Sequence, residues 1–558
     1  MQNNCAKYTI GNTLMVLKPV RVFRFIFILY FYSNPLQSVS QSAIKTNVTK
    51  VEIIHAGSLK FDKNLGNGAK RLIGDVQFKQ DNVLMFCDSA YFYNNNSLDA
   101  FSRVHVQQGD SIHLHGDLLN YNGNTKKAII TKNVVLDKGD MQLFTDVLNY
   151  DMTTSIGYYT TNAKIINKEN VLTSNQGYYF GKTNDLSFKK NVVLINQPPG
   201  ETEPQFIINC DTMRYNTSSK ITYFNGPTTI KSKENLIYCE DGWYNTNKDL
   251  SRFSKNSYIL TKEQKMFGDS LFYDRNKGIG KAIKNIQIID TIQNITITGD
   301  IAIHYELKDL SIVTGNTLLT KINEKDTLYM HADTLKAFGN SKMIKNDTKN
   351  KNAKSDNWVK EKQKAEKDSV QKNQVIFAYH KVKIFKNDLQ GKCDSLIYTS
   401  IDSTMKLIGT PTLWSEDNQL TADSINIRIG KESLKYVELI GTTFMVSQED
   451  SLRYNQVRGK YMKGFFNKNE LYRINVEGNG QTIYFAKDKE KIKAVNRADC
   501  SDLNIYLKDK KIKSITFITK PDATLYPLDK VDVKELKLKD FTWRNKQRPK
   551  TMKDIFVW

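Results

Sequence analysis

Proline and histidine are scarce in this sequence, and it contains no long hydrophobic run. The chain has 558 residues, of which 10 are Pro and 7 are His. Proline interrupts hydrogen-bonded ladders, so its scarcity favours long strands, as do 28 Tyr and 27 Phe. No apolar stretch reaches the roughly 20 residues of a membrane-spanning helix. The few His supply little material for a metal site. We therefore expect an all-β protein that holds no metal and no other cofactor.

Cysteine is also rare, and its number argues against a disulfide framework. The six cysteines are Cys5, Cys87, Cys210, Cys239, Cys393 and Cys500. If Cys5 is lost with an amino-terminal leader, five remain, and an odd number does not suit a fully paired exported protein. We expect free thiols. Cys239 lies two residues before Asp241, and this spacing predicts that it faces away from the side used by Cys87, Cys210 and Cys393.

The chain is strongly basic. Lys and Arg exceed Asp and Glu by 81 − 59 = 22 charges. A surface of this sign attracts nucleic acid, membrane head groups or an acidic glycolipid, and the charge alone does not choose among them.

The amino terminus resembles an export signal. Lys18, Arg21 and Arg24 lie before or within the start of an apolar run over residues 23–32, and small polar residues follow it. This pattern predicts a secretory signal peptide at 1–42, with Met1 or Met15 as the first residue. Export from the cytoplasm makes nucleic acid the least favoured partner.

One six-residue motif recurs along the chain. It consists of a small residue, Asp, any residue, an apolar residue, any residue and an aromatic residue. The clear copies contain Asp88, Asp117, Asp146, Asp211, Asp269 and Asp394. Positions 88, 117, 146 and 175 are each 29 residues apart. Self-similarity of this kind indicates a repeat architecture.

The phase of the apolar residues predicts a bent strand. Before the Asp, apolar residues stand at odd offsets, as at Met85 and Cys87, whereas after it they stand at even offsets, as at Leu119 and Tyr121. A strand with a one-residue slip keeps both halves facing one interior only if it bends or bulges there. We predict an elongated antiparallel folded-over β-jelly roll of about 29-residue repeats, in which the Asp carboxylate accepts backbone N–H bonds at each corner.

These serial motifs behind a signal peptide resemble the OstA-like family, the LptA-type periplasmic proteins of lipopolysaccharide transport, over about residues 50–530. The resemblance implies a jelly roll that shields the acyl chains of lipopolysaccharide. It also implies partners among other jelly-roll transport proteins, joined by edge-strand pairing near residues 51–61 and 515–525. The predicted function is a bridge that carries lipopolysaccharide, or a similar anionic glycolipid, toward the outer membrane.

Two rows of residues are candidates for the lipid groove. The apolar candidates are Met85, Leu114, Leu143, Ile208, Met266, Ile297, Met330 and Leu420, and the aromatic ones are Tyr121, Tyr150, Tyr215 and Tyr273. Both rows are also compatible with simple packing of one sheet against the other, and the tyrosines with a hydroxyl at the wet rim of a groove.

Two segments depart from the repeat. Residues 340–374 are rich in Lys and poor in apolar residues, which predicts a disordered insert between repeat regions at 43–339 and 375–535. Residues 536–558 form a basic tail that we expect to be an unstructured end, with a docking peptide as the alternative.

No catalytic constellation is present. The sequence lacks a nucleophile elbow, a phosphate-binding Gly loop and His pairs at metal-ligand spacing. The aspartates recur in every repeat, whereas an enzyme needs one site, so we expect no enzymatic activity. Two other functions remain open: a non-conducting scaffold in envelope assembly with a sealed interior, and a polysaccharide-processing β-solenoid.

Overall fold

The computed structural model describes residues 49–61, 68–233, 235–262, 264–322, 326–339, 374–430, 433–468, 470–488, 491–508, 511–531 and 536–558. The chain divides into two units, residues 1–48 and 49–558, and all described residues belong to the second. The predicted signal peptide therefore lies outside the described residues, as does the predicted insert except for Gln374, which begins a strand.

The described residues form one antiparallel sheet of 34 strands, which confirms the all-β prediction. The strands before the insert are β1 (Glu52–His55), β2 (Ser58–Phe61), β3 (Lys70–Gln80), β4 (Val83–Phe92), β5 (Ser97–Gln108), β6 (Ile112–Asn122), β7 (Lys127–Lys138), β8 (Met141–Asp151), β9 (Ile156–Tyr159), β10 (Ala163–Asn167), β11 (Asn170–Ser174), β12 (Gln176–Phe180), β13 (Asp185–Asn196), β14 (Phe206–Asn216), β15 (Ile221–Ser232), β16 (Leu236–Asn245), β17 (Leu250–Leu260), β18 (Gln264–Asp274), β19 (Ile279–Asp290), β20 (Ile295–Tyr305), β21 (Leu310–Ile322) and β22 (Thr327–Gly339).

The strands after it are β23 (Gln374–Lys386), β24 (Leu389–Thr399), β25 (Thr404–Ile408), β26 (Thr412–Ser415), β27 (Asn418–Thr421), β28 (Ser424–Ile429), β29 (Leu434–Gln448), β30 (Tyr454–Asn467), β31 (Glu470–Asp488), β32 (Lys491–Lys508), β33 (Lys511–Ile518) and β34 (Asp522–Pro527). Short 3₁₀ helices are η2 (Glu306–Lys308), η4 (Leu528–Lys530), η6 (Asn545–Gln547) and η7 (Met552–Phe556).

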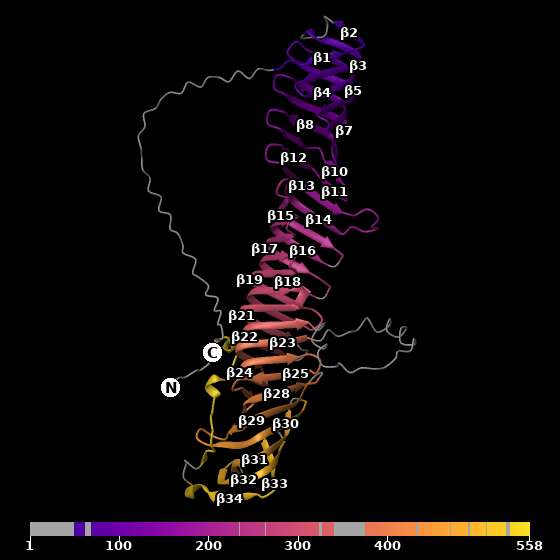
Figure 1. Cartoon of the computed structure of the whole chain (residues 1–558). Coiled ribbons are helices and arrows are strands. Elements are labelled where there is room, and N and C mark those ends of the chain that lie inside the picture. Colours follow the sequence, from indigo (N-terminus) through magenta and orange to yellow (C-terminus); the bar gives the residue numbers. More distant parts are fainter. Residues whose placement is uncertain are drawn as a thin grey trace, which may run out of the picture. The chain divides into compact units, whose positions relative to one another are not determined.

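The sheet is a meander of bent strands that follow one another in chain order (Figure 1). In some places the bend divides a strand into two short ones. Thus β9 and β10 both pair with β8, β25 and β26 both pair with β24, and β33 and β34 both pair with β32. Each strand, whole or divided, therefore contributes one half to each of two walls. In a strand that carries the motif, one half precedes the Asp and the other half follows it. The halves that precede the Asp, together with the strand segments that pair with them, form what we call the first wall. The halves that follow the Asp, with their paired segments, form the second wall.

The bend is a bulge at the predicted place. Between β6 and β7 the register shifts between His115 and Leu118, around Asp117. The returning strand β7 takes up the extra residue with two successive left-handed residues, Lys132 (φ 65°) and Asn133 (φ 52°). Asn tolerates this conformation better than most residues, because its short polar side chain bonds locally. The predicted bulged corner is confirmed.

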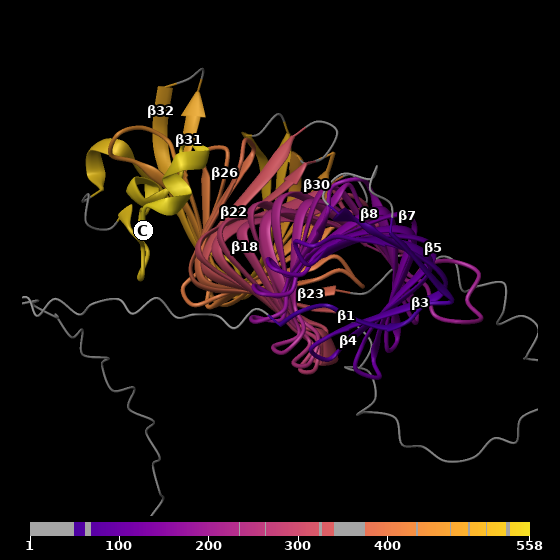
Figure 2. The same ribbon diagram turned by 90° about the horizontal axis from the view of Figure 1, so that it is seen from above.

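The two walls touch at the corner. An added Cβ at Gly116, in the first wall of β6, would lie 2.5 Å from Cγ2 of Ile130, in the second wall of β7. In the same way, an added Cβ at Gly299 in β20 would lie 2.6 Å from Cγ1 of Val313 in β21. The position before the corner acid therefore takes a small residue because a side chain from the facing wall fills the space beside it. Figure 2, which looks along the sheet, shows the curved course of the strands.

Several of the turns that end the second wall share one construction. At Asn122, Asp151, Asn216 and Asn245 the residue after the motif aromatic is Asn or Asp, and its side-chain oxygen accepts backbone N–H bonds two and three residues on. Asn122 Oδ1, for example, accepts from the N–H groups of Asn124 and Thr125. Successive turns also bond to each other, as when Met152 N–H donates to Lys126 O at 3.0 Å. Asx turns of this kind explain why Asn or Asp follows the motif.

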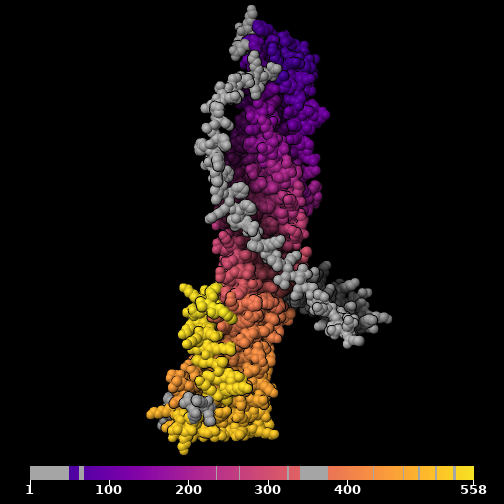
Figure 3. All heavy atoms as spheres, turned by 60° about the vertical axis from the view of Figure 1, so that its left-hand side comes forward, coloured from indigo at the N-terminus to yellow at the C-terminus, as the bar shows by residue number. Residues whose placement is uncertain are grey.

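The basic tail is ordered, so the expected unstructured end is wrong. We call residues 536–558 the strap. It lies on the outer face of the carboxyl-terminal strands (Figure 3), where Leu538 is 4% exposed and Ile555 is 1% exposed. Burial of these two side chains supplies an attachment that composition alone does not reveal. No described helix of the chain is long and apolar enough to cross a bilayer.

Candidate functional site

The corner carboxylates lie on the outside of the bend and bond to the neighbouring strand. Asn133 Nδ2 donates to Asp117 at 2.8 Å, and Asn285 Nδ2 donates to both oxygens of Asp269, at 3.0 and 2.9 Å. In both pairs the Asn follows the acid by sixteen residues. The Asn is the second left-handed residue of the returning strand, so one residue provides both the bend and the donor.

Other corners replace Asn by a different donor. Arg103 donates to Asp88 at 2.8 Å, and His380 contacts Asp394 at 3.3 Å, whose pKa is lowered by hydrogen bonds from Ser395 and His380. Asp211 bonds to Thr212, whereas Asp146 is exposed beside a hollow of about 640 Å³. A backbone donor of the expected kind bonds Asp423, from Thr442 N–H at 3.2 Å. Side-chain donors thus predominate at the six predicted corners, where backbone N–H donors were expected.

One corner differs from the sequence prediction. Asn256 Nδ2 donates to Glu240 at 2.8 Å, again over sixteen residues, so Glu240 and not Asp241 is the corner acid. Cys239 consequently occupies the small-residue position before it. Its side chain is 0% exposed and belongs to the interior cluster. The prediction that Cys239 faces outward is wrong, because it counted from the wrong acid.

The eight apolar groove candidates lie in a single register row of the first wall. Met85 pairs with Val106, which pairs with Leu114, and the chain of partners continues strand by strand to Ile208, Met266, Ile297, Met330 and finally Leu420. We call this the inner row. Neighbouring members lie about 4.8 Å apart. The row places apolar side chains continuously along the interior.

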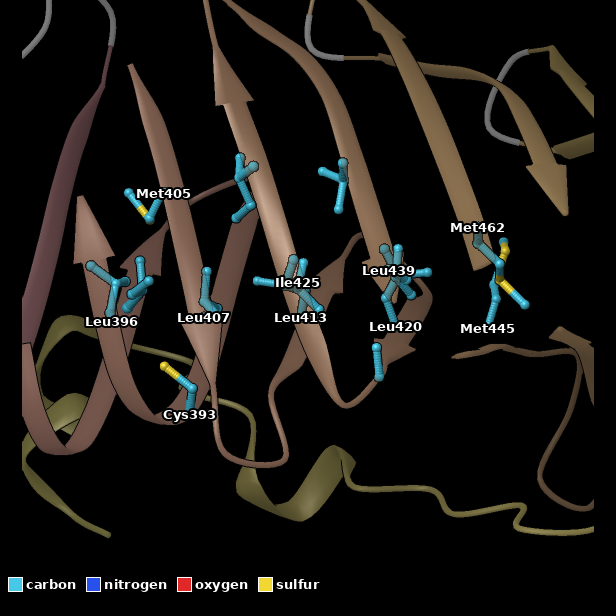
Figure 4. Packing of buried hydrophobic residues seen from close by; sticks show 14 of the residues in the cluster. Cys393, Leu396, Met405, Leu407, Leu413, Leu420, Ile425, Leu439, Met445 and Met462 are labelled. Atoms are coloured by element: carbon cyan, nitrogen blue, oxygen red, sulfur yellow. The ribbon is translucent and has the colours of Figure 1, made fainter. Parts of the chain in front are cut away.

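The inner row is buried near both ends. Met85 is 2% exposed and Phe78, its partner, is 0% exposed. After the insert, Leu413 is 1% and Met445 2% exposed. Figure 4 shows the carboxyl-terminal part of the interior. There, Leu407, Ile425 and Leu439 of the second wall belong to the same cluster of buried side chains as Leu413 and Leu420 of the inner row. In these two regions the walls pack directly against each other.

Between these regions the row is only half-buried. Six consecutive members, one on each strand from β15 to β20, are packed against the interior cluster yet remain partly exposed. They are Ile230, Ile237, Ile259, Met266, Ile288 and Ile297. We call them the open stretch. They share their face with buried Cys239 and Phe253, so their exposure is directed toward the interior, between the two walls.

The predicted tyrosines form a corresponding row in the second wall, in which aromatic and small residues alternate. Tyr121 pairs with Ala128, which pairs with Tyr150. Tyr121 is 1% exposed and its hydroxyl bonds to Gln80. Tyr215 and Tyr273 are half-buried, and the Tyr273 hydroxyl donates to Glu306 at 2.7 Å in the next turn. Burial and this hydrogen bond raise the pKa of Tyr273 to about 12.

The described cysteines are free thiols in the interior, and no described group of His, Cys, Asp and Glu residues could hold a metal ion. Desolvation by burial raises the pKa of Cys210, Cys239 and Cys393 to about 12. At neutral pH these groups are therefore protonated and weakly nucleophilic.

Two segments of the chain match models of known families. Residues 48–199 match the family of OstA-like proteins. Residues 296–433 match the LptA/(LptD N-terminal domain) LPS transport protein family. Most of the open stretch lies between the two matched segments. A search of curated proteins found no match.

Proposed function

Because this chain belongs to the OstA-like family of lipopolysaccharide-transport proteins, we propose that it is a non-enzymatic periplasmic bridge that carries lipopolysaccharide, or a similar anionic glycolipid, toward the outer membrane. The acyl chains lie against the open stretch, and the sugars and phosphates remain outside. The observation that carries this proposal is the half-burial of six consecutive inward-facing apolar residues in a row that is largely buried elsewhere.

The size of the open stretch suits a lipid tail. Six strands at ~4.8 Å spacing span about 24 Å from the first to the last. One leaflet of a bilayer core is about 15 Å thick, half of the ~30 Å of the whole core, so an acyl chain fits within the stretch. Each CH₂ group removed from water there contributes about 0.8 kcal/mol. Ten such groups contribute about 8 kcal/mol before the entropy of ordering the chain is subtracted.

Exposed lysines at the turns offer contacts to an anionic head group. Lys248, Lys277 and Lys308 stand exposed in three successive turns that end the second wall. The same turns carry Asp249, Asp274, Glu306 and Asp309, and Lys277 contacts Asp274 at 3.1 Å, so the lysines act as individual contacts and not as a positively charged surface. A lipid whose tail entered between the walls would hold its phosphates near these ammonium groups, which favours binding through exposed, salt-sensitive attraction.

The two ends of the sheet support docking to other jelly-roll proteins. Within the described residues, β2 pairs only with β3, and β34 pairs only with β32. Leu59 and Phe61 of β2 are 56% and 60% exposed, and Leu525 of β34 is 62% exposed. Unpaired edges with apolar side chains accept a partner strand readily.

Photo-crosslinking from adjacent residues tests the lipid path. Met266 faces the interior, whereas its neighbour Phe267 faces outward, against Tyr258. A photoreactive amino acid at position 266 or 237 should give lipopolysaccharide adducts in cells, and one at 267 should give at least tenfold fewer. Equal labelling at 266 and 267, or no adduct at either 266 or 237, would refute a lipid path through the open stretch.

The packed ends favour a second candidate, a non-conducting scaffold. Phe78 near one end, and Leu407 and Ile505 near the other, are 0% exposed. The passage of a lipid through these packed ends therefore requires the two walls to separate. A scaffold requires no such movement. It predicts no adducts from the interior positions while loss of the protein still impairs envelope assembly.

A further inference from the structure

The strap is held on the outer face of the first wall by three glutamines. They are Gln390 in β24, Gln419 in β27 and Gln456 in β30, each four residues before the corner position of its strand. All three are at most 3% exposed. Because each stands at the same place in successive outgoing strands, they form a row, and the strap follows this row back along the sheet (Figure 3).

Two of these glutamines bond to the main chain of the strap in the manner of a neighbouring strand. Gln456 Nε2 donates to Leu536 O at 2.8 Å, while its Oε1 accepts from Leu538 N–H at 2.9 Å. Gln419 does the same with Thr542 O at 2.7 Å and Arg544 N–H at 2.6 Å. A side-chain amide has one donor and one acceptor side and so satisfies both groups of an extended peptide.

Apolar contacts anchor the strap at its two ends. Leu538 belongs to a cluster with Phe444, Val446, Phe485 and Val495 on the outer face of the wall. At the far end Ile555 is buried and Phe556 lies 4.7 Å from the His331 ring, between ring centroids.

After Trp543 the strap is polar up to the second anchor. Arg548 Nε donates to Gln390 Oε1 at 2.7 Å, and Arg544 Nη1 donates to the Thr412 hydroxyl at 3.0 Å. The strap is basic, as is the chain as a whole, so general electrostatic attraction does not hold it. Specific hydrogen bonds and two apolar anchors do.

The attachment is separable from the sheet. Within the described residues no strand pairs with 536–558, and the ladders β29–β30 and β30–β31 run beneath the strap without depending on it. Pro549 also lacks the N–H that a strand in this position would donate. Removing the strap therefore breaks side-chain contacts and no backbone ladder.

We propose that the outer face of β24, β27 and β30 is a docking surface for an extended peptide, and that residues 536–558 are a latch which occupies it reversibly. The surface selects an aliphatic residue, then aromatic residues, then arginines, in the order of Leu538, Phe541, Trp543, Arg544 and Arg548. Opening the latch uncovers Phe444 and Val446 and frees the glutamine row. A partner segment of the same chemistry then competes with the latch.

A peptide-binding measurement tests this. The chain ending at residue 535 should bind a fluorescent peptide of residues 536–558, and the full-length chain should bind it at least about tenfold more weakly because its surface is occupied. Gln419→Ala in the shortened chain should weaken binding about tenfold, since a pair of hydrogen bonds is lost. Gln287→Ala, an exposed residue of β19 far from the strap in the ladder, is the matched control and should change nothing.

Binding of equal strength by the full-length and shortened chains, or no binding by a folded shortened chain, would overturn the proposal. If the shortened chain does not fold, hydrogen exchange of the full-length protein decides. The amides of Leu538 and Arg544 should exchange at least 100-fold faster than those of the β29–β30 ladder. Equal protection would mean that the strap leaves only when the wall unfolds, which contradicts a latch.

Discussion

The contact between Gly116 and Ile130 allows the folded-over geometry to be tested by a double-mutant cycle. Gly116 belongs to the first wall and Ile130 to the second, and an added methyl at 116 would lie 2.5 Å from Ile130 Cγ2. This distance is about 1 Å shorter than an ordinary carbon contact of ~3.5 Å. Gly116 is not among the glycines with a left-handed backbone, so Gly116→Ala alters packing without straining the main chain.

The expected free energies follow from this overlap. Gly116→Ala should destabilise the surrounding strands by about 1–3 kcal/mol, as other insertions of a methyl into a packed core do. Ile130→Ala removes a side chain that is 1% exposed and should cost about 2–5 kcal/mol. In the double mutant the new methyl fills part of the cavity. The combined cost should therefore be smaller than the sum of the single costs by about 1 kcal/mol or more.

Hydrogen exchange of the β5–β8 amides measures these local free energies, because a long repeat sheet need not unfold in one step. Gly280→Ala is the control. An added Cβ there approaches no atom closer than 3.8 Å, so it should be neutral or stabilising by up to about 1 kcal/mol. Additive effects of Gly116→Ala and Ile130→Ala, within ~0.5 kcal/mol, would refute contact between the walls.

Two further predictions concern pH and thiol reactivity. His105 stacks on His115 at 4.4 Å between ring centroids and contacts His113, which pairs in register with Asp137. Burial and the two neighbouring rings lower the pKa of His105, so the folded state binds its proton less readily than the unfolded state. The stability of β5 and β6 should therefore fall as the pH drops below about 6.5. His105→Phe should reduce this pH dependence. If hydrogen exchange shows the same pH profile for His105→Phe as for the unmodified protein, the prediction is wrong. Cys210 and Cys393, whose pKa values are raised to about 12, should resist iodoacetamide at pH 8 in the native protein and react after denaturation, as mass spectrometry would detect. Labelling of the native protein at the rate of a free thiol would show that the interior is accessible to water there.

Much of the fold follows from local patterns. The reversal of apolar phase at each corner acid predicts the bend, because the side-chain period of a strand is fixed at two residues. The same periodicity correctly grouped Met85, Ile208 and Leu420, which lie hundreds of residues apart, into one row. The Asn of the returning strand recurs sixteen residues after the corner acid, but the pattern of a single strand does not predict the hydrogen bond between the two side chains.

The strap shows where local patterns fail. Its sequence mixes basic, polar and apolar residues without the repeat motif. The glutamines that hold it differ from other outer-face residues only in recurring four residues before the corner position. Gln390, Gln419 and Gln456 can bind an extended peptide together only after their three strands have folded side by side. No short stretch of the sequence therefore predicts this surface.

The repeat, the bent strand and the identity of the inward-facing residues can be predicted from one strand at a time, because each depends on the alternation of side chains within a single strand. By contrast, the folded walls set where the inner row is packed and where, from Ile230 to Ile297, it stays partly exposed. Exposure of these residues depends on how closely the facing wall approaches them. That separation is set by every corner and side chain between the walls, and the pattern of one strand does not encode it.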